Sequence, residues 1–491
     1  MNSILLLIIV LIYFAALLVI AYYASKGATN ESFFIGKKNS SWLLVAYGMI
    51  GTSLSGVTFM SVPGGVNAGH FGYLQVVIGY LIGYMVVAFV LLPLYYKLNL
   101  TSIYSYLENR FGIAAYKTGA SFFILSRTLG ATIRIYLVIK TLQLIILNEL
   151  GIPFALTVFV ILLMILLYTY KGGVKTIVIT DTLQTTFMLL ALIVTVGVIM
   201  SHLNFSFSDL TSTLQAKGYS QVFHYDWKAK NYFLKHIIGG MFITIAMTGL
   251  DQEMMQKNIS CKSLGDAQKN MIVFSSILLF VNLLFLILGG VLYIYAAQNN
   301  IALPAKGDDL FPLIALKYLS PIVGLIFIIG LISALFPSAD GALTALTSSV
   351  CIDLLNLKSR TDMTDKQKES RRITVHLLLT LLFFILIILC KIIDDGNILN
   401  IILTVAGYTY GPLLGLFAFG IITRKQVLTW MVPIVCVLSP IICYVLDTNS
   451  VAWFQGYVFG FELLFVNGLI TFLGLYISSF FIKKQLETSI N

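Results

Sequence analysis

Runs of about twenty apolar residues recur along the whole of this 491-residue chain. Each run is long enough for one helix to cross the ~30 Å hydrocarbon core of a bilayer. Backbone polar groups cannot be left unpaired in lipid, and runs of this length satisfy theirs as helices. Only 11% of the residues are charged, against ~25% in a typical soluble protein. The sequence therefore predicts an all-α polytopic membrane protein that forms a single integral domain.

The apolar pattern predicts thirteen spans, and the basic residues predict their orientation. Basic loops, such as the one that holds Lys257, Lys262 and Lys269 and the one at 356–372, alternate with loops that are poorer in Lys and Arg. Basic loops stay cytoplasmic, so we expect the N-terminus outside and the C-terminus inside a plasma (inner) membrane. The net charge of +10 follows from this bias, and we expect no nucleic-acid partner. The expected spans are 4–23, 41–63, 71–96, 118–147, 153–170, 174–201, 231–250, 271–297, 320–349, 373–392, 397–422, 428–446 and 457–482.

Two of these spans contain residues that interrupt helices. The first interruption is GTSLSG at 51–56, and the second is MTGLDQ at 247–252. Interrupted spans at corresponding positions of two halves indicate a secondary transporter. Unwound backbone at that depth lines a cavity, where its carbonyls and helix ends bind ions and polar solutes.

Acidic residues inside spans are costly and indicate functional sites. Asp181 lies one turn before Thr185, and these oxygens suit Na⁺, because hard cations prefer oxygen ligands. The alternative is a carboxylate that pairs with an arginine for packing.

The ninth span has a polar helix face that contains Ser333, Pro337 and Asp340. Proline cannot donate a backbone hydrogen bond to the carbonyl one turn before it. A freed carbonyl, the Ser338 hydroxyl and the Asp340 carboxylate would form a cation site. The alternative is a proline kink without a ligand.

Two arginines and one tyrosine are further candidates. Arg127 and Arg134 are seven residues apart on one helix face. They could receive a substrate carboxylate through bidentate pairing, or they could neutralise Asp181 or Asp340. Tyr408, beside Gly and Pro in the eleventh span, could bind a solute or pack at a kink.

No catalytic set is evident. The five cysteines are scattered without a CxxC motif, and the five histidines are dispersed. We therefore expect no enzyme activity, because a membrane enzyme needs a nucleophile, base or metal set in a cavity.

Four motifs, in this order and spacing, make the chain resemble the solute:sodium symporter family, which includes sodium/glucose, sodium/proline and sodium/sialic acid cotransporters. The resemblance covers nearly the whole chain. The motifs are TSLSGVTF at 52–59, YKGG at 170–173 followed by Thr180 and Asp181, GLDQ at 249–252 followed by Gln256 and Lys257, and ALFPS at 334–338 followed by Asp353.

The resemblance implies a leucine-transporter-type fold with a 5+5 inverted repeat. Repeat one would span 41–201 and repeat two 231–422, with an extra N-terminal helix at 4–23 and C-terminal helices at 428–482. It also implies a sodium site formed by the carbonyls of Gly51, Leu54 and Ala334 and the hydroxyl of Ser338. The chain departs from the family pattern at Pro337, where a hydroxyl residue is usual, and at Asp340, where some members have a second-site serine. Asp181 matches an acidic position near the sodium pathway.

The leading hypothesis is a symporter that uses Na⁺ entry to import a small polar organic solute by alternating access. The alternatives are a proton-coupled symporter, with Asp181 or Asp340 as proton carrier, and a transporter-derived membrane sensor. Expected partners are the solute, Na⁺ and the lipid bilayer, and no obligate protein partner is evident. The solute should bind between the two interruptions, with Arg127 or Arg134 as counter-charge if it is anionic. The other expected solute contacts are Ser53, Ser55, Thr58, Thr248 and Tyr408.

Overall fold

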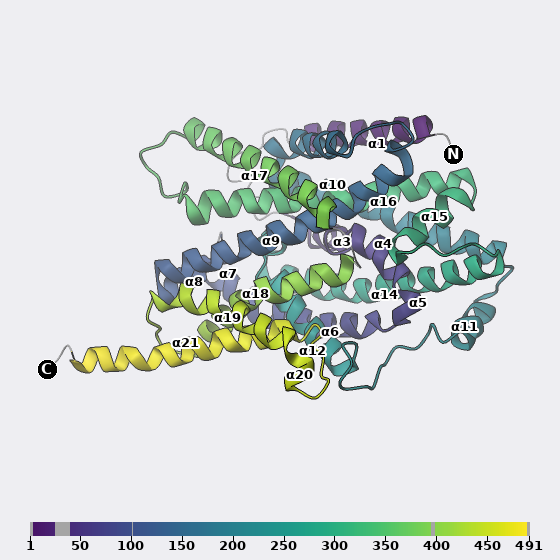
Figure 1. The fold of residues 1–491 in the computed structure, drawn as a ribbon. Helices are drawn as coiled ribbons and strands as arrows, with labels where there is room; N and C mark the ends of the chain where they lie inside the picture. The colour runs from purple at the N-terminus through teal and green to yellow at the C-terminus, as the bar shows by residue number, and fades with distance from the viewer. Residues whose placement is uncertain (1–2, 25–39, 101, 394–397, 489–491) are drawn as a thin grey trace.

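The computed structural model describes residues 3–24, 40–100, 102–393 and 398–488 (Figure 1). The side chains of residue 3, of 170–175, which include the YKGG motif, and of 393, 398 and 482–488 lie outside this description. The described residues form helices, with one isolated bridge between Ser40 and Cys261.

Most of the helices run roughly side by side in one bundle (Figure 1). Among the described residues, ten helices are long and apolar enough to cross a membrane, and two bent helix pairs raise the number to twelve. The unbent spanning helices lie in α1 (Ser3–Ala24), α6–η2–α7 (Tyr73–Val86, Val87–Leu91, Leu92–Lys97), α9–η3 (Ile113–Leu142, Gln143–Leu147), α10 (Phe154–His202), α14 (Leu264–Gln298), α16–η6 (Pro321–Ser349, Val350–Leu354), α17 (Asp365–Ile393), α18 (Ile398–Ile422), α19 (Met431–Thr448) and α21 (Leu463–Thr488).

Shorter helices connect the spans or cover their ends. They are α5 (Val66–Gly69), α8 (Ser105–Phe111), α11 (Phe207–Ala216), η5 (Gly307–Asp309), α15 (Leu310–Lys317) and α20 (Ser450–Trp453).

The first bent pair consists of α3 (Trp42–Ser53) and α4 (Gly56–Gly64), which meet at 55°. Leu54 and Ser55 between them have extended backbone conformations. The Ser55 hydroxyl accepts a hydrogen bond from the backbone N–H of Val57 (3.3 Å), which caps α4 as serine commonly does at a helix start. The interruption predicted at 51–56 is confirmed.

The second bent pair joins α12 (Phe233–Thr244) and the π-helix η4 (Ile245–Gly249) to α13 (Gln252–Ile259), at 66°. Asp251 caps α13, because one carboxylate oxygen accepts hydrogen bonds from the backbone N–H groups of Glu253 (2.9 Å) and Met254 (3.3 Å). The interruption predicted at 247–252 is also confirmed.

The expected spans at 153–170 and 174–201 both fall within α10, which is assigned as one helix of 49 residues. Its apolar parts are Phe154–Thr169 and Thr176–His202. Phe154 lies beside Lys391 at the end of α17, Thr169 hydrogen-bonds to His376 toward the start of α17 (2.9 Å), and His202 lies beside Tyr295 near the end of α14. The two parts therefore run in opposite directions.

The two ends of the bundle carry different connections. The N-terminus and α11 lie at one end, and the C-terminus and the loop between α16 and α17 lie at the other (Figure 1). The chain therefore begins and ends on opposite faces of the bundle.

Helices α6 and α12 touch along their backbones. A Cβ atom added to Gly79 would lie 2.2 Å from the carbonyl oxygen of Ile237, and one added to Gly240 would lie 2.2 Å from that of Val76. Such separations are shorter than van der Waals contact, so only glycine fits at either position. Small residues allow membrane helices to approach this closely.

Candidate functional site

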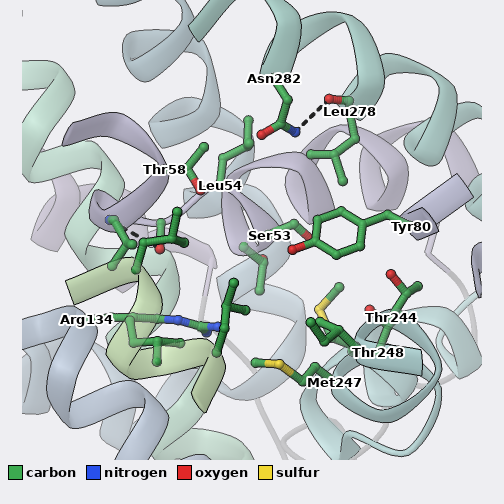
Figure 2. Close-up of a pocket in the computed structure, with 18 of the residues that line it drawn as sticks. Ser53, Leu54, Thr58, Tyr80, Arg134, Thr244, Met247, Thr248, Leu278 and Asn282 are labelled. Carbon is green, nitrogen blue, oxygen red and sulfur yellow. Dashed lines mark hydrogen bonds between the residues drawn. The ribbon is translucent and has the colours of Figure 1, made fainter. Parts of the chain in front are cut away.

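A cavity of about 100 Å³ lies between the two helix breaks (Figure 2). Its walls come from the first break, α6, α9, the second break, α14 and the start of α18. Polar side chains form a large part of the lining: Thr52, Ser53, Ser55, Thr58, Tyr73, Tyr80, Tyr84, Arg127, Arg134, Thr244, Thr248 and Asn282. Six of the seven expected solute contacts are among them, the exception being Tyr408.

Tyr84 faces both breaks across the cavity. Its side chain lies close to that of Ser53, at the end of α3, and to that of Thr248, in η4. These three residues come from three different helices, and all line the cavity.

The two arginines have different surroundings. Arg127 is buried and pairs with Glu253, and its guanidinium also lies 3.8 Å from a carboxylate oxygen of Asp251. Arg134 lines the cavity (Figure 2) and, among the described residues, has neither a salt bridge nor a hydrogen-bonded partner. Neither arginine forms a salt bridge with Asp181 or Asp340 in the described part of the chain. Of the two arginines in the cavity wall, Arg134 therefore has the guanidinium that is free to bind a solute.

Tyr408 lies outside the cavity. Its hydroxyl donates to the Asp447 carboxylate (2.6 Å), and its ring lies beside Tyr444 of α19. Tyr410, two residues later, points elsewhere, and its hydroxyl donates to the Asp251 carboxylate (3.0 Å). Two residues along a helix correspond to a rotation of about 200°, so the two tyrosines point in different directions. The expectation that Tyr408 contacts the solute has no support in this geometry, because Tyr408 does not line the cavity. The side chains that α18 contributes to the cavity are Leu399, Ile402 and Leu403.

Lys257 is a buried residue, although it was expected in a cytoplasmic basic loop. It is 3% exposed, and its ammonium lies 2.8 Å from a carboxylate oxygen of Asp181 and 3.3 Å from one of Glu253. It also donates to the Thr52 hydroxyl (2.7 Å). The lysine of α13 thus neutralises Asp181 and links α10 to the first break.

These ion pairs form one buried network. It contains three carboxylates, from Asp181, Asp251 and Glu253, and two cations, from Arg127 and Lys257. With all five groups ionised, the sum is −3 + 2 = −1.

The two breaks differ in how their carbonyl oxygens are satisfied. At the second break, the Tyr95 hydroxyl donates to the carbonyl of Gly249 (2.8 Å), and the Tyr104 hydroxyl donates to that of Leu250 (2.9 Å). At the first break, no described residue donates a hydrogen bond to the carbonyls of 51–54. Free carbonyl oxygens of this kind bind cations.

Several buried side-chain oxygens also have no hydrogen-bond partner. They include the second carboxylate oxygen of Asp181 and the hydroxyls of Thr185 and Ser338. A Cβ atom on Gly51 would lie 2.3 Å from the Thr185 hydroxyl oxygen, so α3 and α10 touch at this point. Ala334, one turn before Ser338, is fully buried on α16, which packs against α3 and α4.

The expected polar face of α16 is occupied by three neighbouring helices. Ser333 hydrogen-bonds to Tyr13 of α1 (2.7 Å), and Thr347 to the Nδ1 of His376 of α17 (2.8 Å). Both carboxylate oxygens of Asp340 are used, one by the Tyr168 hydroxyl and the other by the backbone N–H of Gly341. Asp340 therefore offers no unpaired oxygen, in contrast to Ser338.

The sequence interpretation missed four features of the site. Tyr73, Tyr80 and Tyr84 line the cavity from one face of α6, and their spacing of seven and four residues was a visible signal. Asn282 is an amide inside the apolar run at 271–297. Polar groups at such depth usually have a partner or a ligand, so Asn282 could have been chosen from the sequence.

Comparison with known proteins gives one family over most of the chain. The model of the sodium:solute symporter family matches residues 33–429. Among characterised relatives, a sodium/sialic acid symporter of Proteus mirabilis is 23% identical over 404 residues, which cover 81% of this chain and 80% of that protein. Sodium-coupled monocarboxylate transporter 1 of Mus musculus is 26% identical, over 80% of this chain and 64% of that protein.

A solved structure has the same fold. A substrate-bound, outward-open Na⁺-coupled sialic acid symporter superposes with a TM-score of 0.81 at 21% identity, covering 96% of this chain and 97% of that one. The likeness confirms the all-α transporter fold expected from the sequence.

Proposed function

Because this chain belongs to the sodium:solute symporter family, we propose that it couples Na⁺ entry to the uptake of a small organic anion by alternating access. The observation that supports an anionic solute is the unpaired guanidinium of Arg134, which lies in the wall of a cavity between two helix breaks. Guanidinium groups pair bidentately with carboxylates. Two relatives support this class, since their names specify sialic acid and monocarboxylates. The family consists of transporters, and we propose no catalytic activity.

The solute site in this proposal is the cavity itself. Ser53, Ser55 and Thr58 from the first break and Thr248 from the second would offer donors and acceptors to the solute. Arg134 would bind its carboxylate. Arg127, which is already paired with two carboxylates, would hold the second break in place.

The proposed Na⁺ site lies at the first break. Its ligands would be the carbonyls of Gly51, Leu54 and Ala334 and the hydroxyl of Ser338. Asp181 would contribute its unpaired carboxylate oxygen. Asp340, whose carboxylate accepts from Tyr168 and from the backbone N–H of Gly341, would contribute only its negative charge. The unbonded carbonyls at 51–54 and the unpartnered side-chain oxygens of Asp181 and Ser338 support this assignment.

The repeat boundaries and the orientation belong to the same proposal. Repeat one would run over 41–201 and repeat two over 231–422, so each repeat begins with a bent helix pair. The N-terminus and α11 would face outside, and the loop between α16 and α17 would face the cytoplasm.

The proposed function is tested by ligand-induced thermal stabilisation of the purified protein. The panel contains carboxylates, neutral sugars and zwitterionic amino acids, each measured with Na⁺ and with K⁺ at the same ionic strength and at two pH values. We expect stabilisation by carboxylates only when Na⁺ is present. Stabilisation by a neutral sugar alone would refute the anionic class, and stabilisation that follows pH but not Na⁺ would favour proton coupling.

Ser338→Ala should raise the Na⁺ concentration that gives half-maximal uptake by roughly tenfold, about what loss of one direct ligand worth ~1.4 kcal/mol produces. Ser348→Ala is the matched control, because the Ser348 hydroxyl is bonded to the Thr344 carbonyl of its own helix (2.8 Å). Uptake as a function of Na⁺ concentration in proteoliposomes measures both. Equal Na⁺ dependence of the two variants would place the cation elsewhere.

Ser359→Cys, in the exposed loop after α16, should react with an impermeant thiol reagent only after the membrane is opened. Ser212→Cys, on exposed α11 at the other end of the bundle, should react in intact cells. Both are made in a chain that lacks Cys390, because the other four native cysteines are buried. The reverse labelling pattern would invert the proposed orientation.

A further inference from the structure

We propose that the transported anion also carries a hydrogen-bond donor, a hydroxyl or an amide N–H, which binds the side-chain oxygen of Asn282. The solute class is then a hydroxy- or acylamino-carboxylic acid rather than a simple carboxylate. This inference rests on the proposed function, since Arg134 and Asn282 would bind two groups of one solute.

Asn282 is a buried amide in the cavity wall. It lies on α14, is 2% exposed, and lines the cavity that Arg134 also lines. Its side-chain nitrogen donates to the carbonyl oxygen of Leu278, one turn earlier (2.8 Å). Its side-chain oxygen has no hydrogen-bond partner.

The orientation of this amide follows from chemistry. The Leu278 carbonyl can only accept a hydrogen bond, so the group that faces it must be the amide nitrogen. The opposite orientation would place two acceptor oxygens against each other and leave the nitrogen without this bond. The oxygen is therefore the atom of Asn282 that is left for another partner, and it requires a donor.

A buried acceptor without a donor is unfavourable, so this oxygen is bonded to water or to solute in the working protein. A solute hydroxyl that replaces water keeps the hydrogen bond. A methylene group at the same place displaces the water and leaves the acceptor unpaired. Sites built to hydrogen-bond a hydroxyl reject the analogue that lacks it more strongly than apolar pockets reject a change in size.

The arrangement of the two side chains supports a solute that contacts both. Asn282 and Arg134 project from different helices, α14 and α9, on different sides of the cavity, with Ser53, Leu54 and Thr58 of the first break between them (Figure 2). A solute held by its carboxylate at Arg134 would extend past the first break toward Asn282. Its donor group would then decide how well it fits.

The alternative is that Asn282 only stabilises α14 and makes no contact with the solute. Asparagine inside a helix often bonds to the carbonyl one turn before it, and this role needs only the nitrogen. A purely structural Asn282 would affect the stability of the protein without changing its preference between solutes. The two roles are therefore separable by measuring selectivity.

The experiment compares butyrate with 2-, 3- and 4-hydroxybutyrate and with N-acetylglycine, by isothermal titration of the purified full-length protein in Na⁺. We expect the best donor-bearing acid to bind the wild type at least ~10-fold more tightly than butyrate. Asn282→Leu, which keeps the approximate volume without the acceptor, should reduce this ratio to about threefold or less while leaving butyrate binding nearly unchanged. Ser275→Ala is the matched control on the same helix, because the Ser275 hydroxyl is bonded to the Ile272 carbonyl (2.9 Å) away from the cavity lining.

Equal binding of butyrate and all donor-bearing acids by the wild type would overturn the inference, and this result needs no variant. A preference that persists in Asn282→Leu would also overturn it. In both cases binding of the acids would still depend on Na⁺ and Arg134, so the proposed function would stand. Failure of every acid to bind, with a neutral sugar bound instead, would refute the proposed function and this inference together.

Discussion

Arg134→Gln should weaken binding of the carboxylate solute by about 30- to 4,000-fold. This range corresponds to ~2–5 kcal/mol, the usual loss when one member of a buried charge pair is removed. The solute carboxylate would enter the cavity without a counter-charge, because the other arginine in the wall, Arg127, is already paired. Isothermal titration with and without Na⁺ measures the effect.

The thermal stability of Arg134→Gln should be nearly unchanged, since Arg134 has no salt bridge in the described part of the protein. Arg134→Lys should recover part of the affinity, because lysine keeps the charge but loses the bidentate geometry. Arg127→Gln should have the opposite profile, with lower stability, because it leaves Glu253 without its guanidinium partner. Wild-type affinity in Arg134→Gln would show that the carboxylate binds elsewhere.

Lys257→Met should lower the free energy of unfolding by about 3–5 kcal/mol, the typical cost of leaving a buried charge unpaired. Asp181 is fully buried, and its nearest cation is the Lys257 ammonium at 2.8 Å. Glu253 would lose a second cation at the same time. A fall in the midpoint of thermal or chemical unfolding in detergent measures this effect.

The double variant Lys257→Met/Asp181→Asn should recover much of this loss, because it removes the uncompensated charge as well. Lys262→Met is the control, since Lys262 is exposed five residues later, and surface substitutions usually change stability by less than ~0.5 kcal/mol. If the double variant were less stable than Lys257→Met, the lysine would not act by neutralising Asp181.

The helix breaks were predictable because their causes are local. Ser55 and Asp251 each bond to backbone N–H groups two or three residues later, and such residues favour caps over helix interiors. The same reasoning placed Ser53, Ser55, Thr58 and Thr248 in one region, and all four line the cavity.

The ion pairs were not predictable, because they depend on contacts between residues far apart in the chain. Lys257 follows a polar segment and was therefore expected in a basic loop. The 66° bend before α13 instead brings Lys257 to Asp181, 76 residues away in sequence. The partners of Tyr408 and Tyr410 were also not predictable from the sequence. Each lies next to a glycine, and their directions around the axis of α18 decide that Tyr410 bonds to Asp251 and Tyr408 to Asp447.

The glycine contact between α6 and α12 limits how this transporter can move. Two backbones that touch at Gly79 and Gly240 cannot slide or roll past one another without steric overlap, so we expect these helices to travel as one rigid unit. The close contact continues at Gly83, where an added Cβ atom would lie 2.5 Å from the carbonyl oxygen of Met241 in α12. Relative motion during transport is therefore expected at other surfaces, where α16 and α10 face the breaks and where the proposed Na⁺ site lies. A Na⁺ ion bound at that site would then contact both a moving part and a stationary part of the protein, and it would restrict their relative motion.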